Sequence, residues 1–304
     1  MIVRERPNWF GMMLVWRGSV LPVILPQLVL TAAFATLVTL LHGELFSFKV
    51  TLTFVPFSLI GIAIAIFLGF RNSASYDRFW EARKQWGALL IHARSLARQA
   101  LTLQDDPVAA REIIHATIAF THALRHQLRD TDALPDLRKT LPADFVDGTL
   151  AAARFRPALI LLHIGEKIAE LRRSGRIDPI LVTAMERHLD ALSDVLGACE
   201  RLAGTPLPFT YSVILHRTIY LYCFLLPFGL VDSIGVLTPL IVAFLAYTFY
   251  ALEALSDQLE EPFGTEANDL ALDAMATMIE TTLREMLGES DLPEPPAAKA
   301  YLLT

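Results

Sequence analysis

Two long hydrophobic stretches open the pattern of apolar and polar positions along the chain. Residues 19–41 and 50–70 carry no charged side chain. A helix needs about 20 apolar residues to cross the roughly 30 Å hydrocarbon core of a bilayer. Each stretch therefore predicts one transmembrane helix.

Two further hydrophobic stretches lie near the end of the chain, at residues 218–231 and 233–252. The first of them is short and follows His216 and Arg217. It is either a membrane helix with a polar start or a buried amphipathic helix. We expect a membrane helix, which gives four spans in total.

The distribution of basic residues predicts the orientation, because lysine and arginine collect on the cytoplasmic side of membrane helices. The loop between the first two spans, residues 42–49, holds only Lys49, and Glu44 balances it. Basic residues instead flank the pair of spans: Arg4, Arg6, Arg17, Arg71, Arg78, Arg83 and Lys84. We expect a multi-pass protein of the inner (plasma) membrane with both termini in the cytoplasm.

A cleaved signal peptide is the alternative for the first stretch. Ala33-Phe34-Ala35 matches the small-residue pattern of a cleavage site. However, Pro22 and Pro26 interrupt the apolar run, and cleavage would leave the second hydrophobic helix without its partner. We expect the first stretch to remain as a membrane helix.

The middle of the chain has helical signals and no alternation of the strand kind. Pro107 follows two aspartates, and Asp178 precedes Pro179, so each proline is expected to begin a helix. Residues 131–142 contain two prolines and predict a loop, and residues 204–208 predict a break before the third hydrophobic stretch. The fold class predicted is an all-α integral membrane protein.

Composition agrees with a membrane protein and indicates an uneven charge. Hydrophobic residues make up 54% of the chain and charged residues 19%, against about 25% charged residues in soluble domains. The last 52 residues hold twelve acidic and two basic side chains. We divide the chain into residues 1–70 with the first two spans, a helical cytoplasmic region 71–210, the last two spans 211–252, and an acidic cytoplasmic segment 253–304.

The second span carries two stripes with a four-residue spacing, which places each member about 40° around the helix from the last. The first stripe is bulky and apolar: Ile62, Ile66 and Phe70. The second is small, as in helices that approach one another closely: Gly61, Ala65 and Gly69. From spacing alone, the bulky stripe is either an ordinary lipid-facing ridge or the apolar ridge of a helix that packs tightly against copies of itself or other neighbours.

Signals for other chemistry are weak. His115, His122 and His126 fall near one helical face with Glu112, a pattern that fits a zinc or nickel ion but is more typical of solvated or hydrogen-bonded histidines. The chain lacks a phosphate-binding glycine loop, a nucleophile elbow and paired cysteines. We expect no enzyme, no metal, no cofactor and no nucleic-acid partner.

Several motifs resemble those of the bestrophins. The run Ile66-Phe67-Leu68-Gly69-Phe70, followed by Arg78-Phe79-Trp80, is similar to their second membrane helix, and residues 70–83 resemble the bacterial branch of the family. Glu261-Pro262-Phe263-Gly264 is similar to their Pro-Phe-Gly element after the last span.

The resemblance implies a homopentameric ion channel in the lipid bilayer, with a central pore lined by the second helix of each subunit. It implies that Ile62, Ile66 and Phe70 form a hydrophobic neck that passes monovalent ions, and that Ile180 forms a cytoplasmic aperture. The further alternatives are a membrane scaffold without a channel and a transporter.

The ion and its control are predicted separately. Animal bestrophins follow the Pro-Phe-Gly element with a run of acidic residues that binds calcium, whereas residues 265–270 hold only Glu266 and Asp269. We therefore expect a calcium-independent channel. The resemblance of residues 71–83 to the bacterial branch and the acidic segment both favour cations such as sodium, and an anion (chloride) channel of the same architecture is the alternative.

Overall fold

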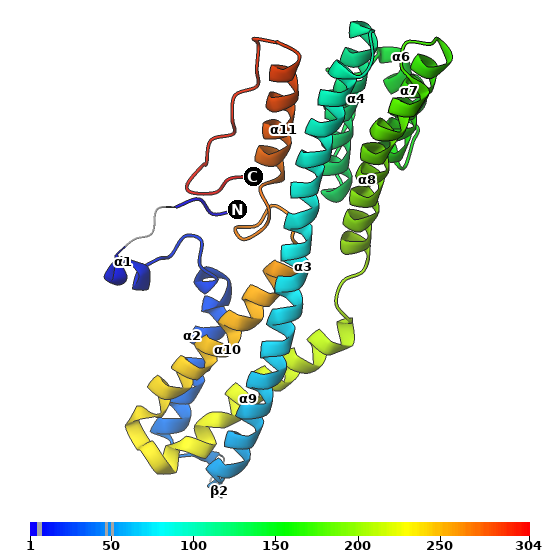
Figure 1. The fold of residues 1–304 in the computed structure, drawn as a ribbon. Coiled ribbons are helices and arrows are strands. Elements are labelled where there is room, and N and C mark those ends of the chain that lie inside the picture. Colours follow the sequence, from blue (N-terminus) through cyan, green and yellow to red (C-terminus); the bar gives the residue numbers. More distant parts are fainter. Residues whose placement is uncertain (5–7, 46–47, 50–51) are drawn as a thin grey trace. The chain divides into compact units, whose positions relative to one another are not determined.

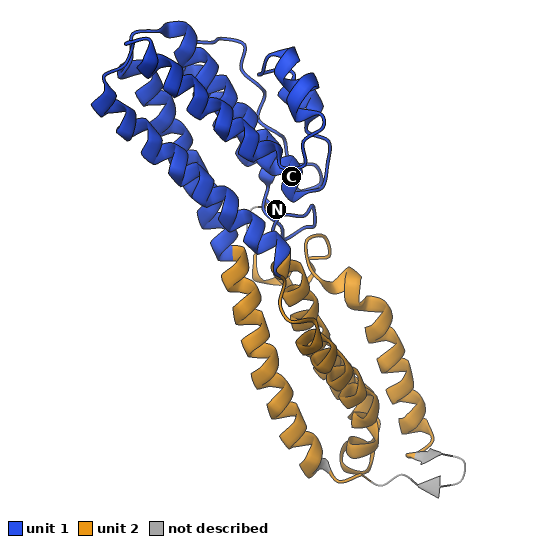
Figure 2. Ribbon diagram, turned by 90° about the vertical axis from the view of Figure 1, so that its right-hand side faces the viewer, with its two compact units in different colours: residues 1–3, 80–205, 262–304 blue, residues 4–79, 206–261 orange. Residues whose placement is uncertain are grey.

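The computed structural model describes residues 1–4, 8–45, 48–49 and 52–304 of the chain. These form two compact units, which Figure 2 shows in different colours. Unit 1 consists of residues 1–3, 80–205 and 262–304, and unit 2 of residues 4–79 and 206–261. The four-part division drawn from the sequence follows the expected membrane boundaries and stays a prediction.

Unit 2 contains the hydrophobic helices. Its elements are α1 (Trp9–Met13), α2 (Leu21–Leu40), the two-residue strands β1 (Glu44–Leu45) and β2 (Phe48–Lys49), the first part of α3 (Phe54–Thr102), α9 (Phe209–Ile234), the 3₁₀ turn η2 (Gly235–Leu237) and α10 (Thr238–Glu260). Helix α10 packs against α2 and α9, and α2 also packs against α9. The paired strands β1 and β2 occupy the predicted loop, a small departure from an all-helical chain.

Three stretches of the described residues are long and apolar enough to cross a membrane: Leu21–Leu40, Val55–Thr102 and Phe209–Glu260. The third is divided at Gly235, whose φ of 53° suits a residue without a side chain. This division produces two helices, α9 and α10, which pack against each other. The two hydrophobic stretches predicted near the end of the chain are therefore both helices.

Unit 1 is a helical bundle. Its elements are the second part of α3, α4 (Pro107–Leu128), α5 (Leu134–Leu137), α6 (Ala143–Phe145), the π-helical turn η1 (Val146–Leu150), α7 (Arg156–Arg173), α8 (Pro179–Gly204) and α11 (Leu272–Met286). Helix α4 packs against α7, α8 and α11, and its apolar face is fully buried. Figure 1 shows α3 as one continuous helix that contributes to both units.

Local sequence signals explain where several helices begin and end. The Asp106 carboxylate accepts hydrogen bonds from the amides of Val108 and Ala109 and caps α4, and Asp178 caps α8 in the same way. Both predicted helix starts are confirmed, as is the break at residues 204–208. The predicted loop at residues 131–142 also contains the short helix α5, which begins close to a proline.

Candidate pore-lining helix and its supports

The first part of α3 exposes a row of apolar side chains. Ile62, Ile66 and Phe70 are 59%, 53% and 65% exposed in the single chain, while Ile64 and Leu68 on the same helix are buried. The four-residue spacing keeps the exposed side chains on one side of the helix. The structure thus brings the three predicted neck residues together on a surface that unit 2 leaves uncovered.

The small-residue stripe divides into two parts. A Cβ atom added to Gly61 would lie 2.9 Å from the Tyr222 hydroxyl oxygen, so the glycine permits close packing of α3 on α9. Ala65 is exposed, and no atom lies within 4 Å of a Cβ added to Gly69. Of the three residues of this stripe, Gly61 is therefore the one that packs closely against another helix of unit 2.

Arg71 follows the exposed row directly and is buried, with 3% of its surface exposed. Its Nη2 atom donates to Asp257 Oδ1 at 2.5 Å and to Glu260 Oε2 at 3.4 Å, both on α10. The Arg78 Nε atom donates to the backbone carbonyl of Glu260 at 3.1 Å. These two arginines therefore bind the end of α10. The sequence analysis missed this contact, although two acids one turn apart after a hydrophobic helix were a usable signal.

A second oxygen of Glu260 extends this network. Glu260 Oε1 accepts a hydrogen bond from the amide of Leu207 at 3.0 Å, at the entry to α9. One turn further along α3, the hydroxyls of Ser75 and Ser256 lie 2.9 Å apart in a buried contact. Separating α3 from α10 would leave these buried polar groups without partners, which is costly. The contacts therefore hold α3 against α10 just beyond Phe70.

Ile180, the predicted aperture residue, lies in unit 1 at the second position of α8. Its side chain is 79% exposed, and its amide donates to the Asp178 carboxylate at 2.8 Å. The structure leaves it on a free surface of unit 1, at the start of a capped helix.

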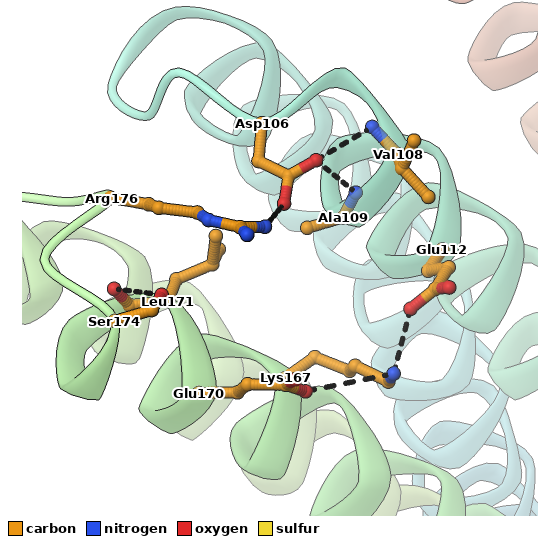
Figure 3. Close-up of a pocket in the computed structure, with 9 residues that line it drawn as sticks. All are labelled: Asp106, Val108, Ala109, Glu112, Lys167, Glu170, Leu171, Ser174 and Arg176. Carbon is orange, nitrogen blue, oxygen red and sulfur yellow. Dashed lines mark hydrogen bonds and ion pairs between the residues drawn. The ribbon is translucent and has the colours of Figure 1, made fainter.

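The turn before α8 is anchored to the turn before α4. Arg176 forms an ion pair with Asp106, the Asp105 amide donates to the Arg176 carbonyl at 3.3 Å, and Gln104 pairs with Ile177 in an antiparallel bridge. Hydrogen bonds from the α4 backbone, together with Arg176, lower the pKa of Asp106. Figure 3 shows this ion pair at one side of a polar cleft.

The other side of the same cleft carries a second link between α4 and α7. The Lys167 ammonium group lies 2.8 Å from Glu112 and 3.7 Å from Glu170, as Figure 3 shows. These contacts raise the pKa of Lys167, with the Glu112 hydrogen bond as the main cause. The charged groups of the cleft therefore pair with one another across the two helices.

The side chain of Arg129, at the end of α4, contacts the Pro-Phe-Gly element and the loop that follows it. Its guanidinium donates to the carbonyls of Phe263 and Leu270, at 3.2 and 3.4 Å, and to the Asp273 carboxylate at 2.7 Å. Asp269 is buried, which raises its pKa, and it accepts a hydrogen bond from the Glu266 amide. The guanidinium of Arg129 is thus the positive group that the two carbonyls and the Asp273 carboxylate bind.

The three histidines of α4 contact different carboxylates. The imidazole Nε2 atom lies 3.2 Å from Glu289 for His115, 2.8 Å from Glu280 for His122 and 3.0 Å from Asp136 for His126. The His122 contact is the main cause of the lowered pKa of Glu280. Among the described residues no group of three potential ligands converges on one point, and the histidines serve as links between helices.

Comparison with known proteins places this architecture in a family. The family model for bacterial and fungal bestrophin proteins matches residues 1–285. The chain belongs to the bestrophin family. A bestrophin homologue from Klebsiella pneumoniae has a solved structure with a TM-score of 0.85 and 46% identity, and the match covers 88% of this chain and 99% of that one.

Two curated relatives extend the match along nearly the whole chain. A voltage-dependent anion channel-forming protein of Ralstonia nicotianae is 51% identical over 306 residues and covers all of both chains. A protein of the same description from Escherichia coli K12 is 44% identical and covers 96% of each chain. The predicted family is therefore confirmed, as is an all-helical membrane protein that forms channels and is not an enzyme.

Proposed function

We propose that five copies of this bestrophin surround one central pore in the bacterial inner membrane, with both termini in the cytoplasm and four spans per subunit. In this proposal Ile62, Ile66 and Phe70 of each α3 stack as three apolar rings. The observation that carries it is the row of exposed apolar side chains on a helix whose other face, with Ile64 and Leu68, is buried.

The physical basis is the poor hydration of a narrow apolar tube. Water leaves such a constriction, so an ion cannot pass until the rings separate. One α3 helix cannot enclose a pore, and cyclic symmetry supplies the remaining walls. The exposed positions Ala65 and Gly69 then lie at contacts with neighbouring copies, and Ile180 forms a second ring at the cytoplasmic aperture.

Anions such as chloride are the first candidate for the conducted ion. The support comes from the Ralstonia and Escherichia relatives, both described as voltage-dependent anion channel-forming proteins. The cation preference, predicted from the resemblance to the bacterial branch and from the acidic segment, has less support. Several of those acids form ion pairs with arginines, such as Asp273 with Arg129 and Asp257 with Arg71, so the field they exert on an ion is reduced.

Cations such as sodium remain the second candidate because of one observation at the neck. Arg71 and Arg78, the basic residues that follow the neck most closely, are bound to α10 through Asp257 and Glu260. The charge of Arg71 is thus compensated by two carboxylates, so this arginine supplies no free positive ring for anions.

The test is the reversal potential of the purified protein in planar bilayers with a sodium chloride gradient. A value near the chloride equilibrium potential is expected. A value near the sodium equilibrium potential would replace the first candidate with the second, and the absence of current in assembled protein would remove the channel itself. Mass in detergent, corrected for bound detergent, is expected to equal five subunits.

Gating without calcium is also part of the proposal. Calcium prefers six to eight oxygen ligands, several of them charged, whereas Arg129 already engages the carbonyls of Phe263 and Leu270. We expect currents to be unchanged by a calcium chelator. A loss of current that micromolar calcium restores would contradict this part of the proposal.

A further inference from the structure

An open groove of about 760 Å³ lies between α2 and α9 in unit 2. Leu30 and Phe34 line it from α2, and Leu221 and Phe224 line it from α9. The rings of Phe34 and Phe224 stack with centroids 4.2 Å apart. Leu30 and Leu221 are largely exposed. Both helices belong to stretches apolar enough to cross a membrane, so this part of the groove suits a hydrocarbon chain.

One end of the groove is polar. His216 and Arg217 line it there, about two turns after the start of α9. The Nδ1 atom of His216 lies 2.9 Å from the buried carboxylate of Glu253. This carboxylate contacts the histidine and does not line the groove. The imidazole also stacks on Tyr220, with ring centroids 4.3 Å apart.

Arg217 has no ion pair with any residue that the structure describes, although it belongs to a hydrophobic helix. A charged side chain in such a helix is costly unless it reaches a partner or water. A guanidinium offers several N–H donors in a planar fork that matches the oxygens of a phosphate. The groove thus combines a long apolar stretch with an arginine that has no ion pair among the described residues at one end.

We propose that this groove binds an anionic phospholipid, with the phosphate at Arg217 and an acyl chain along Leu30, Phe34, Leu221 and Phe224. The apolar length of the groove selects a lipid over free phosphate, because an inorganic ion would leave the leucine and phenylalanine side chains uncovered. Charge complementarity at Arg217 selects a headgroup with a net negative charge.

The experiment is native mass spectrometry of the detergent-purified, full-length protein. It is titrated with phosphatidylglycerol or with phosphatidylcholine of the same acyl chains. The wild-type protein is expected to bind phosphatidylglycerol about fivefold more tightly, as one arginine near an anionic headgroup contributes about 1 kcal/mol. Arg217→Gln should abolish the preference and Arg217→Lys should keep most of it.

Two control variants separate this site from bulk electrostatics and from misfolding. Arg111→Gln removes the same charge from an exposed position on α4 and should keep the preference. Leu221→Trp fills the groove and should weaken binding of both lipids. The proposal is overturned if Arg217→Gln retains the preference or if Arg111→Gln loses it equally. It is also overturned if Leu221→Trp binds both lipids like the wild type, or if Arg217→Gln lowers the oligomer mass, which would identify the groove as a contact between copies.

Discussion

Each part of α3 carries a group of apolar residues, and the two groups lie in opposite surroundings. In the second part, Trp86, Leu89 and Leu96 are fully buried in unit 1. In the first part, Ile62 and Ile66 are more than half exposed in unit 2. An apolar residue of a soluble bundle is exposed at a cost in free energy, whereas in a membrane helix lipid or a neighbouring copy covers it.

The comparison teaches that exposure alone does not identify a pore. Phe67 is exposed almost as much as Ile66, 51% against 53%, yet only Ile66 belongs to the row with a four-residue spacing. The neck proposal therefore rests on spacing together with exposure, and residues that share only the exposure are natural controls.

The largest effect is expected where an apolar residue of α3 is buried. Trp86→Ala should lower the free energy of unfolding by about 3–5 kcal/mol, because it leaves a cavity in the core of unit 1. The unfolding temperature in detergent should fall by roughly 10 °C. The matched variant Ile62→Ala should change stability by about 0.5 kcal/mol or less. Equal losses in both variants would contradict the difference between the two parts.

A smaller change in the exposed row should alter conduction and leave the fold intact. Ile66→Ala widens and hydrates the middle ring, so single-channel conductance should rise by about two- to tenfold, which corresponds to a barrier lower by about 0.4–1.4 kcal/mol. Phe67→Ala is the control and should conduct like the wild type. Unchanged or smaller currents for Ile66→Ala in assembled protein would count against the neck.

The smallest expected effect is a pH dependence of stability. It arises at a contact between two histidines, one of them on the second part of α3. The Nδ1 atoms of His92 and His188 lie 3.1 Å apart. Burial, and then His92, lower the pKa of His188 below its ordinary value of about 6.5. As pH falls below about 6.5, His188 binds a proton more readily in the unfolded chain than in the folded protein. The folded protein therefore loses stability on acidification.

His188→Gln tests this contribution through unfolding temperatures at pH 7.5 and 5.5. The variant should lose less stability on acidification than the wild type. A decline of the same size in both proteins would assign the pH dependence to other groups.

Local signals made much of the fold predictable. The caps at Asp106 and Asp178 lie within a few residues of the helices that they begin, and the apolar spacing of Ile62, Ile66 and Phe70 is visible in the sequence itself. The short helix α5 was not predicted, because nearby prolines favour a loop in a local interpretation.

Partners distant in the sequence were not predictable in the same way. Arg71 binds Asp257, 186 residues later, and His122 contacts Glu280, 158 residues later. No periodicity connects such positions, so only the packing of α3 on α10 and of α4 on α11 reveals them. A neck is harder still to predict from one chain, because its walls come from neighbouring copies.

The central claim, that the row on α3 faces a pore, is tested most directly by thiol modification during current recording. Ile66→Cys and Phe67→Cys differ by about 100° around the helix at nearly equal exposure. Both native cysteines are buried, and burial raises the pKa of the Cys199 thiol to about 12, so background reaction is slow. A charged methanethiosulfonate reagent applied to open channels should change the current of Ile66→Cys and leave that of Phe67→Cys unaltered. Equal responses, or a response of Phe67→Cys alone, would contradict the assignment of this row to the pore.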